Sequence, residues 1–94
     1  MNKVELVELL AKRLGTNRIE ANRVLNAVTD TIIEQTAATG KVSITGFGVF
    51  ERVHREARTV RNPKTGAKKP VEAMDYVRFR PGSMLKRVVS GDGS

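Results

Sequence analysis

Cationic side chains suited to binding a polyanion gather in one short stretch of this sequence. Residues 52–69 hold seven of them against the single carboxylate of Glu56, namely Arg52, Arg55, Arg58, Arg61, Lys64, Lys68 and Lys69. The net charge of +7 comes entirely from residues 41–94, because residues 1–40 contain five Lys or Arg and five Asp or Glu. Such a concentrated field attracts nucleic acids and other polyanions, although a charge run can also be only a solvated face.

No group of residues has the composition of a catalytic or metal site. His54 is the only histidine and lies among cations, which disfavours a general base, and no second metal ligand accompanies it. Glu51 and Glu56 lack an accompanying nucleophile or acid motif, and no glycine-rich phosphate-binding motif is present. We therefore expect His54 to be an exposed strand residue. We expect no enzyme activity, no cofactor, no metal and no small-molecule substrate.

Two helices over residues 1–40 are the first elements that could position the cationic stretch. Apolar residues recur at helical spacing over 4–14 and again over 21–32, and the second stripe is broad enough to need more than one neighbour. An asparagine three residues before a glutamate predicts each helix start, and a glycine predicts each end. These residues are Asn2, Glu5 and Gly15 for the first helix and Asn17, Glu20 and Gly40 for the second.

After Gly40 the pattern changes to that of β-strands. Val42 and Ile44 alternate with polar residues, and the sequence Gly–Phe–Gly at 46–48 predicts a tight reversal. We expect an antiparallel sheet over 41–53 and 71–82, and between them a β-arm over 54–70 with little to bury. Pro63 and Gly66 predict a hairpin turn at the arm's tip. A short helix over 83–90 and a polar tail over 91–94 complete an α+β fold.

The 94 residues predict a single domain that is short of core. Without the arm, about 70 residues remain, which is marginal for one hydrophobic core. No cysteine is present to add a disulfide. We therefore expect an obligate dimer in which two chains share one core.

The arm has the chemistry of a DNA-groove ligand. A two-stranded ribbon is narrow enough to enter a groove, and arginine together with Asn62 suits the edges of a narrow minor groove. Arg55, Arg58 and Arg61 recur every third residue, so a twist or a bulge is needed to aim them at one groove. Pro63 is a turn former by position, and its ring without an N–H could also act as a wedge between base pairs.

Three motifs in order resemble the bacterial HU and integration host factor family of DNA-bending proteins. They are TGFGVFE at 45–51, ARTVRNPKTG at 57–66 and FRPGSMLK at 79–86, and the resemblance extends over residues 1–90. It implies an intertwined homodimer, or a heterodimer with a paralogue. In this dimer an α-helical base with a helix-turn-helix pair carries a three-stranded antiparallel sheet and long protruding β-ribbon arms. The arms wrap double-stranded DNA through the minor groove, and Pro63 becomes the intercalating wedge.

The resemblance also assigns DNA contacts to individual residues. The arm arginines correspond to Arg55, Arg58 and Arg61, and the phosphate contacts of the body correspond to Lys3, Gly46, Arg80 and Lys86. Several positions depart from the family, among them Glu72 at a frequent proline and residues 67–69, which replace an often acidic stretch. Ser83 replaces a frequent lysine, and Val77 replaces a frequent proline, so we expect the return strand to pair more continuously there. Pro70 is an additional proline that either removes a ladder hydrogen bond or faces outward.

We therefore expect a non-enzymatic architectural protein that binds double-stranded DNA with weak sequence preference and bends or compacts it. A site-specific subunit resembling integration host factor remains the nearest alternative. An RNA-binding protein and a module that binds an acidic protein are two others. The aromatic residues Phe47, Phe50, Tyr76 and Phe79 are expected in the core, which disfavours stacking on RNA bases.

The ends of the sequence bear on location. No apolar run is long enough to span a bilayer, and the N-terminus lacks the apolar core of a signal peptide. We therefore expect a cytoplasmic, nucleoid-associated protein without membrane contact. No long basic extension follows residue 90, so we expect all DNA contact to come from the domain itself.

Overall fold

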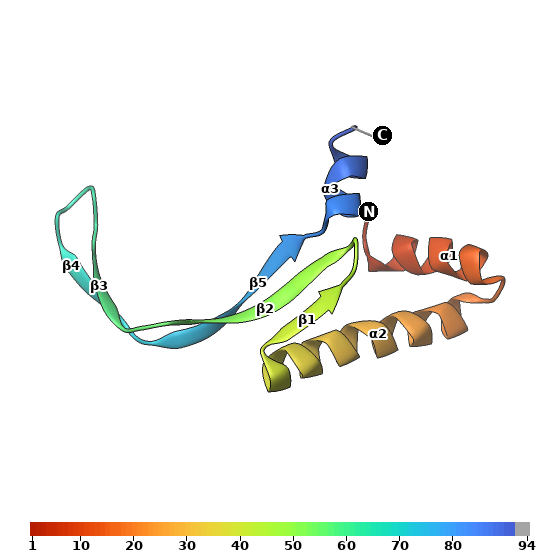
Figure 1. Ribbon diagram of the computed structural model, residues 1–94, viewed down its shortest axis with the longest axis horizontal. Coiled ribbons are helices and arrows are strands. Elements are labelled where there is room, and N and C mark those ends of the chain that lie inside the picture. Colours follow the sequence, from red (N-terminus) through yellow and green to blue (C-terminus); the bar gives the residue numbers. More distant parts are fainter. Residues whose placement is uncertain (92–94) are drawn as a thin grey trace. The chain divides into compact units, whose positions relative to one another are not determined.

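The computed structural model describes residues 1–91. The chain forms two compact units, of which the first is Met1–Glu34 and the second begins at Gln35. Residues 1–91 form three helices, a three-stranded sheet and a two-stranded ribbon, which together make an α+β fold (Figure 1). In chain order the elements are α1 (Lys3–Leu14), α2 (Arg18–Thr39), β1 (Lys41–Ile44), β2 (Gly48–Arg55), β3 (Arg58–Arg61), β4 (Lys68–Val71), β5 (Met74–Pro81) and α3 (Ser83–Val89). Within residues 1–91, no helix combines the length and apolar character that crossing a bilayer requires.

The caps of α1 and α2 confirm the predicted helix boundaries. The Asn2 side chain accepts a hydrogen bond from the Glu5 N–H, and Asn17 does the same for Glu20, each at 2.9 Å. Such caps satisfy backbone N–H groups that have no partner within the helix. Gly15 ends α1 with φ +68°, in the left-handed region that glycine adopts without strain.

The first unit has a small core. Its buried apolar side chains are Val7, Ala11 and Ala21, with Leu10 and Leu25 packed partly buried against them. Other apolar residues of the predicted helix stripes are exposed, with 62% at Val4, 49% at Leu14 and 51% at Val28, whereas Val24 and Ile32 are partly buried. The helical spacing is therefore confirmed, whereas part of the apolar surface that it aligns is exposed.

The sheet of the second unit is antiparallel with strand order β1-β2-β5. Its β2–β5 ladder is continuous from Gly48 opposite Pro81 to Arg55 opposite Met74. Val77 pairs with Arg52 inside this ladder. The return strand is therefore uninterrupted at 77, as predicted.

The two faces of this sheet differ in chemistry because side chains alternate along each strand. Phe50 and Phe79 pair on one face, and their ring centroids lie 4.8 Å apart. Phe47 joins them at 5.8 Å from Phe79, yet Phe47 and Phe79 are 46% and 40% exposed. Tyr76 lies on the opposite face and is partly buried, so the four aromatic residues expected in the core are divided between the two faces of the sheet. The three phenylalanines form a cluster that the chain itself leaves partly uncovered.

The reversal between β1 and β2 is held against the start of α3. Gly46 has φ +81° and its carbonyl accepts a hydrogen bond from the Leu85 N–H at 3.1 Å. A Cβ atom at Gly82 would lie 2.6 Å from the Gly46 backbone, so only glycine fits this contact. The helix predicted over 83–90 is observed as Ser83–Val89, and the predicted polar tail lies outside the described residues after Gly91.

Candidate nucleic-acid interface

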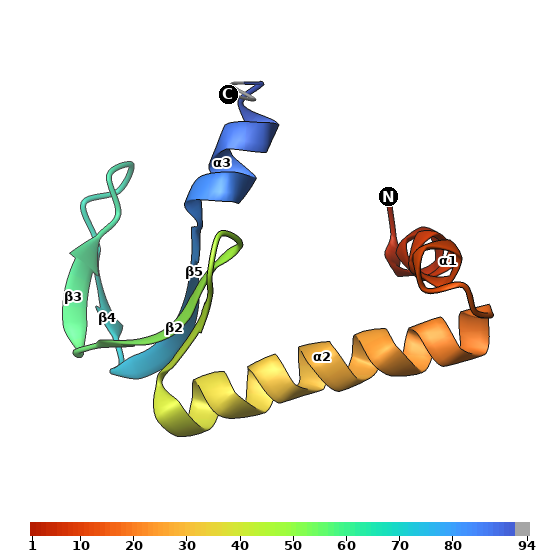
Figure 2. The ribbon, with the colours of Figure 1, turned by 45° about the vertical axis from the view of Figure 1, so that its right-hand side comes forward.

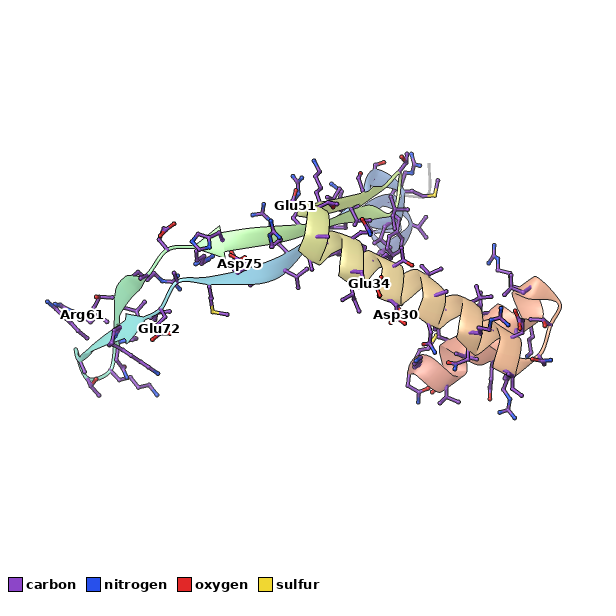
Figure 3. All side chains as sticks on the ribbon, turned by 90° about the horizontal axis from the view of Figure 1, so that it is seen from below. Asp30, Glu34, Glu51, Arg61, Glu72 and Asp75 are labelled. Carbon is purple, nitrogen blue, oxygen red and sulfur yellow. The ribbon has the colours of Figure 1, made fainter. Side chains whose placement is uncertain are left out.

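The arm is a two-stranded antiparallel ribbon of β3 and β4 that extends from the sheet (Figures 1 and 2). Its ladder runs from Arg58 opposite Val71 to Arg61 opposite Lys68. Every residue from Arg55 to Pro70 is exposed. Figure 3 places Arg61 at the far end of the ribbon, away from Glu51 on the sheet. The arm therefore presents its cations to solvent and contributes almost nothing to a core.

Asn62 organises the tip of the arm. Its backbone carbonyl accepts from the Gly66 N–H at 2.7 Å, and its side-chain oxygen accepts from the Lys64 N–H at 2.9 Å. A third bond, from the Asn62 N–H to the Ala67 carbonyl, closes the turn at 2.9 Å. Gly66 has the predicted positive φ, +73°. With one side-chain oxygen lone pair engaged in the turn, the amide N–H₂ is the part of Asn62 best placed to contact a base edge.

Pro63 lies in this turn between Asn62 and Lys64, the two residues whose groups make hydrogen bonds of the turn. The Asn62 and Lys64 groups make the bonds that hold the tip, and Pro63 has no N–H to contribute. The Pro63 ring is exposed to solvent at the tip of the arm. An apolar ring at the end of a cationic ribbon is thus available to a ligand rather than to the fold.

The ribbon is interrupted without a change of register. Between the two ladders, Glu56 and Ala57 on one strand face Glu72 and Ala73 on the other, and none of the four belongs to a strand. Equal numbers on both sides mean that this is not a one-residue bulge. Figure 2 shows that the ribbon bends between β2–β5 and β3–β4. Any common aim of the arm arginines must therefore come from twist and bending, the first of the two predicted means.

Pro70 occupies a position that costs the ladder no hydrogen bond. It pairs with Thr59, three pairs before the hydrogen-bonded Asn62–Ala67 pair at the tip. Hydrogen-bonded and non-hydrogen-bonded pairs alternate along an antiparallel ladder, so the Pro70 nitrogen faces outward. Of the two predicted positions for this proline, the structure supports the outward one.

Arg55 is held in place at the root of the arm. Its Nε donates to the Tyr76 hydroxyl at 2.9 Å, and its guanidinium lies 5.2 Å from the centre of the Tyr76 ring. A cation over an aromatic face is attracted by the ring's quadrupole. Tyr76 thus supports a cation that the sequence identified, although the sequence placed Tyr76 itself in the core.

His54 is an exposed residue of strand β2, as predicted, and it also lies in an ionic cluster beside the arm root. Its Nδ1 lies 2.7 Å from an Asp75 carboxylate oxygen and its Nε2 lies 3.0 Å from a Glu56 oxygen. The hydrogen bond to Asp75 is the main reason that the pKa of His54 is raised above 6.5, and the Glu56 charge adds to it. Among the described residues, no group of three or more His, Cys, Asp or Glu side chains is arranged to hold a metal ion.

Arg52 is turned toward the protein. Its guanidinium donates to the Ala37 carbonyl near the end of α2 and lies 4.0 Å from an Asp75 oxygen. These contacts give the Arg52 side chain a structural role, so this predicted DNA-binding residue is less free to reach a ligand than the exposed cations of the arm.

The body residues named by the sequence lie in different settings. Lys3, in the first unit, donates to the Asn26 side chain at 2.7 Å. Lys86 lies in the last turn of α3 and is exposed, and Gly46 forms the turn against that helix. Arg80 contacts a Glu51 carboxylate oxygen at 2.6 Å.

Arg78 is a further cation of the sheet that was not among the predicted DNA contacts. It lies on the same face of β5 as Arg80 and contacts the second oxygen of Glu51 at 2.7 Å. The hydrogen bond from Arg78 is the main cause of a lowered pKa at Glu51. The alternation of arginines at 78 and 80 was the available signal, but the Glu51 contact depends on strand register.

Comparison with known proteins identifies the class to which this fold and cationic arm belong. Residues 1–90 match the profile of the family described as Bacterial DNA-binding protein. DNA-binding protein HU 2 of Streptomyces coelicolor is 45% identical over 91 residues, which are 97% of this chain and 41% of that protein. DNA-binding protein HU-alpha of Pseudomonas aeruginosa is 39% identical over 96% of this chain and 100% of its own length. The chain thus spans less than half of the Streptomyces relative and the whole of the Pseudomonas one.

Solved structures of HU proteins are also similar to this chain. An Anabaena HU–DNA cocrystal structure superposes with a TM-score of 0.84 at 39% identity and covers 96% of this chain and 98% of that one. A mutant HU from Thermotoga maritima gives a TM-score of 0.67 at 29% identity, with 95% and 99% covered. The chain belongs to the bacterial HU family of DNA-binding proteins, a family not known for enzymes.

Proposed function

We propose that this protein is a non-enzymatic architectural protein that binds double-stranded DNA through its arm and bends or compacts it. The observation that carries the proposal is the exposed cationic ribbon, which ends in a hydrogen-bonded turn with Pro63 at its tip. The HU relatives and the HU–DNA cocrystal structure support DNA as the ligand. A nucleoid-associated, cytoplasmic location follows from that ligand.

Phosphate neutralisation supplies most of the affinity in this proposal. The contacting residues are Arg55, Arg58, Arg61, Asn62, Lys64, Lys68 and Lys69 in the arm, with Lys3, Gly46, Arg80 and Lys86 in the body. Arg52 contributes mainly by holding α2 to the sheet. Few of these groups read base edges, so the sequence preference is weak and favours DNA that bends easily.

Pro63 supplies the bend. Its ring enters a base step in the minor groove, and unstacking costs on the order of a few kcal/mol per step. The additional arm–phosphate contacts that a bent duplex permits offset this cost. The tip keeps its shape meanwhile, because Asn62 and Gly66 hold it independently of the Pro63 side chain.

In this proposal the active form is a dimer, and each chain of the dimer is a single DNA-binding domain. Among residues 1–91, only Val7, Ala11 and Ala21 are buried apolar residues, while large apolar side chains on every helix are exposed. So small a core does not offset the conformational entropy of folding. A second copy that covers the phenylalanine cluster and the helix stripes supplies the missing burial, and a paralogue is the alternative partner.

Replacing Arg58 and Arg61 together by alanine tests the role of the arm. In a dimer this removes four cations, so the slope of log K against log salt should flatten by up to about 3.6. Gel shifts over a salt series, on intact and nicked duplexes of several sequences, measure this. Equal weakening on all sequences is expected. A loss confined to one sequence, or an enriched motif after selection from random duplexes, would instead support the site-specific alternative.

A further inference from the structure

We propose that Glu51 is a positioning residue that holds Arg78 and Arg80 as a paired phosphate-binding site on the sheet. This inference rests on the proposed function, and it extends the DNA contact from the arm root across one face of the three-stranded sheet. We call this surface the arginine face, defined by Glu51, Arg55, Tyr76, Arg78 and Arg80.

The strand register brings these side chains together. Glu51 is directly opposite Arg78 in the β2–β5 ladder, and Arg80 is two residues farther along β5 on the same face. One carboxylate oxygen of Glu51 lies 2.7 Å from Arg78 Nη2 and 3.2 Å from its Nε, and the other lies 2.6 Å from Arg80 Nη2. One carboxylate therefore orients two guanidinium groups.

The Glu51 carboxylate is more buried than the two guanidinium groups, which leaves the arginines accessible to a ligand. The Glu51 side chain is only 14% exposed, whereas Arg78 and Arg80 are 53% and 55% exposed. Each guanidinium has five N–H donors, and Glu51 engages two on Arg78 and one on Arg80. The outward donors of both arginines remain available to phosphate oxygens, while the carboxylate is screened beneath them.

The carboxylate also determines whether two neighbouring arginines can share one orientation. Two guanidinium groups on alternate residues repel each other, and each has many rotamers that binding would have to restrict. The hydrogen bond from Arg78 lowers the pKa of Glu51, so the carboxylate stays ionised and keeps both groups in place. The arginines are thus ordered before DNA arrives.

Arg55 continues the same face toward the arm. It lies on the face of β2 that carries Glu51, and Tyr76 holds it from β5. The cations Arg80, Arg78 and Arg55 therefore follow one another along the face from the body to the arm root. A phosphate backbone that leaves the arm meets this row next.

The replacement Glu51→Gln tests the proposal because charge and positioning predict opposite signs. Removing a negative charge makes the protein more basic, so charge alone would tighten DNA binding. Loss of positioning should instead weaken duplex binding about five- to tenfold, because two freed arginines must be ordered on binding. Fluorescence anisotropy with a labelled duplex measures the dissociation constant. The matched control is Glu72→Gln, an exposed arm carboxylate whose removal should tighten binding.

Coupling separates positioning from a general structural effect. In an Arg78→Gln/Arg80→Gln background, Glu51→Gln should cause no further loss of affinity. Thermal unfolding and sedimentation of each variant verify folding, and Arg78→Gln alone, which should also weaken binding, serves if Glu51→Gln does not fold. If Glu51→Gln binds as tightly as the wild type or more tightly, or if Arg78→Gln has no effect, this proposal is wrong. Failure of the wild type itself to bind duplex would refute the proposed function instead.

Discussion

At the scale of single residues, Asn62 and Pro63 have different roles at the tip of the arm. Asn62 supplies backbone and side-chain acceptors for the turn, whereas Pro63 makes none of these bonds and exposes its ring. Neighbouring positions can therefore be changed with separate consequences.

Pro63→Ala should leave the dimer folded and bound to DNA but should reduce bending. Alanine keeps the turn, since Asn62 and Gly66 hold it, but it presents one methyl group where the ring would enter a base step. DNA circularisation, or energy transfer between dyes at the duplex ends, measures the bend. Asn62→Ala is the contrasting variant, because it removes the side-chain acceptor of the turn and leaves the proline. Unchanged bending by Pro63→Ala would exclude the wedge.

Prediction from the sequence succeeded at residues whose role is local. The caps at Asn2 and Asn17 and the positive φ of Gly66 depend on neighbours within a few positions. Arg78 and Tyr76 depend on partners across a strand pair, and the sequence alone does not set that register. The pairing of Tyr76 with Val53 decides that it lies on the face away from the phenylalanine cluster.

At the scale of elements, the arm root combines a strand end with a cluster of charges. His54 from β2 faces Asp75 from β5, and Glu56 and Arg52 complete the surroundings. Both imidazole nitrogens lie near carboxylates, an arrangement that suits the doubly protonated ring. The cluster therefore joins the two strands most firmly when His54 is charged.

The stability of the protein should carry the signature of His54 titration. The folded-state pKa lies above 6.5, so the stabilisation is complete below pH 6.5 and is lost as the pH rises through the folded-state value. Thermal midpoints of the wild type and His54→Gln, measured from about pH 5.5 to about pH 8.5, should differ most at the acidic end. Parallel curves across this range would show that the cluster does not contribute.

At the scale of the whole molecule, net positive charge and exposed apolar surface are concentrated in different parts of the sequence. All of the net positive charge arises after residue 40, while the helices before it are neutral overall and expose much apolar surface. The sequence indicated this shortage of core from length alone. It could not show which residues stay uncovered, because that depends on how the helices pack.

The proposed dimer makes stability depend on protein concentration. Sedimentation equilibrium should give twice the chain mass, and the thermal midpoint should rise with concentration because dissociation accompanies unfolding. A monomer with a concentration-independent midpoint would refute the shared core. Mixing with a paralogue and measuring subunit exchange distinguishes a homodimer from a heterodimer.

The register that the ribbon keeps across its interruption has a mechanical consequence. Because Glu56–Ala57 and Glu72–Ala73 contribute equal numbers of residues, the bend between the two ladders does not slide one strand past the other. The two strands therefore keep the same pairing register on both sides of the interruption. In the proposed DNA complex, we expect such an arm to follow duplexes of different curvature while its tip turn and its root contacts keep their own geometry.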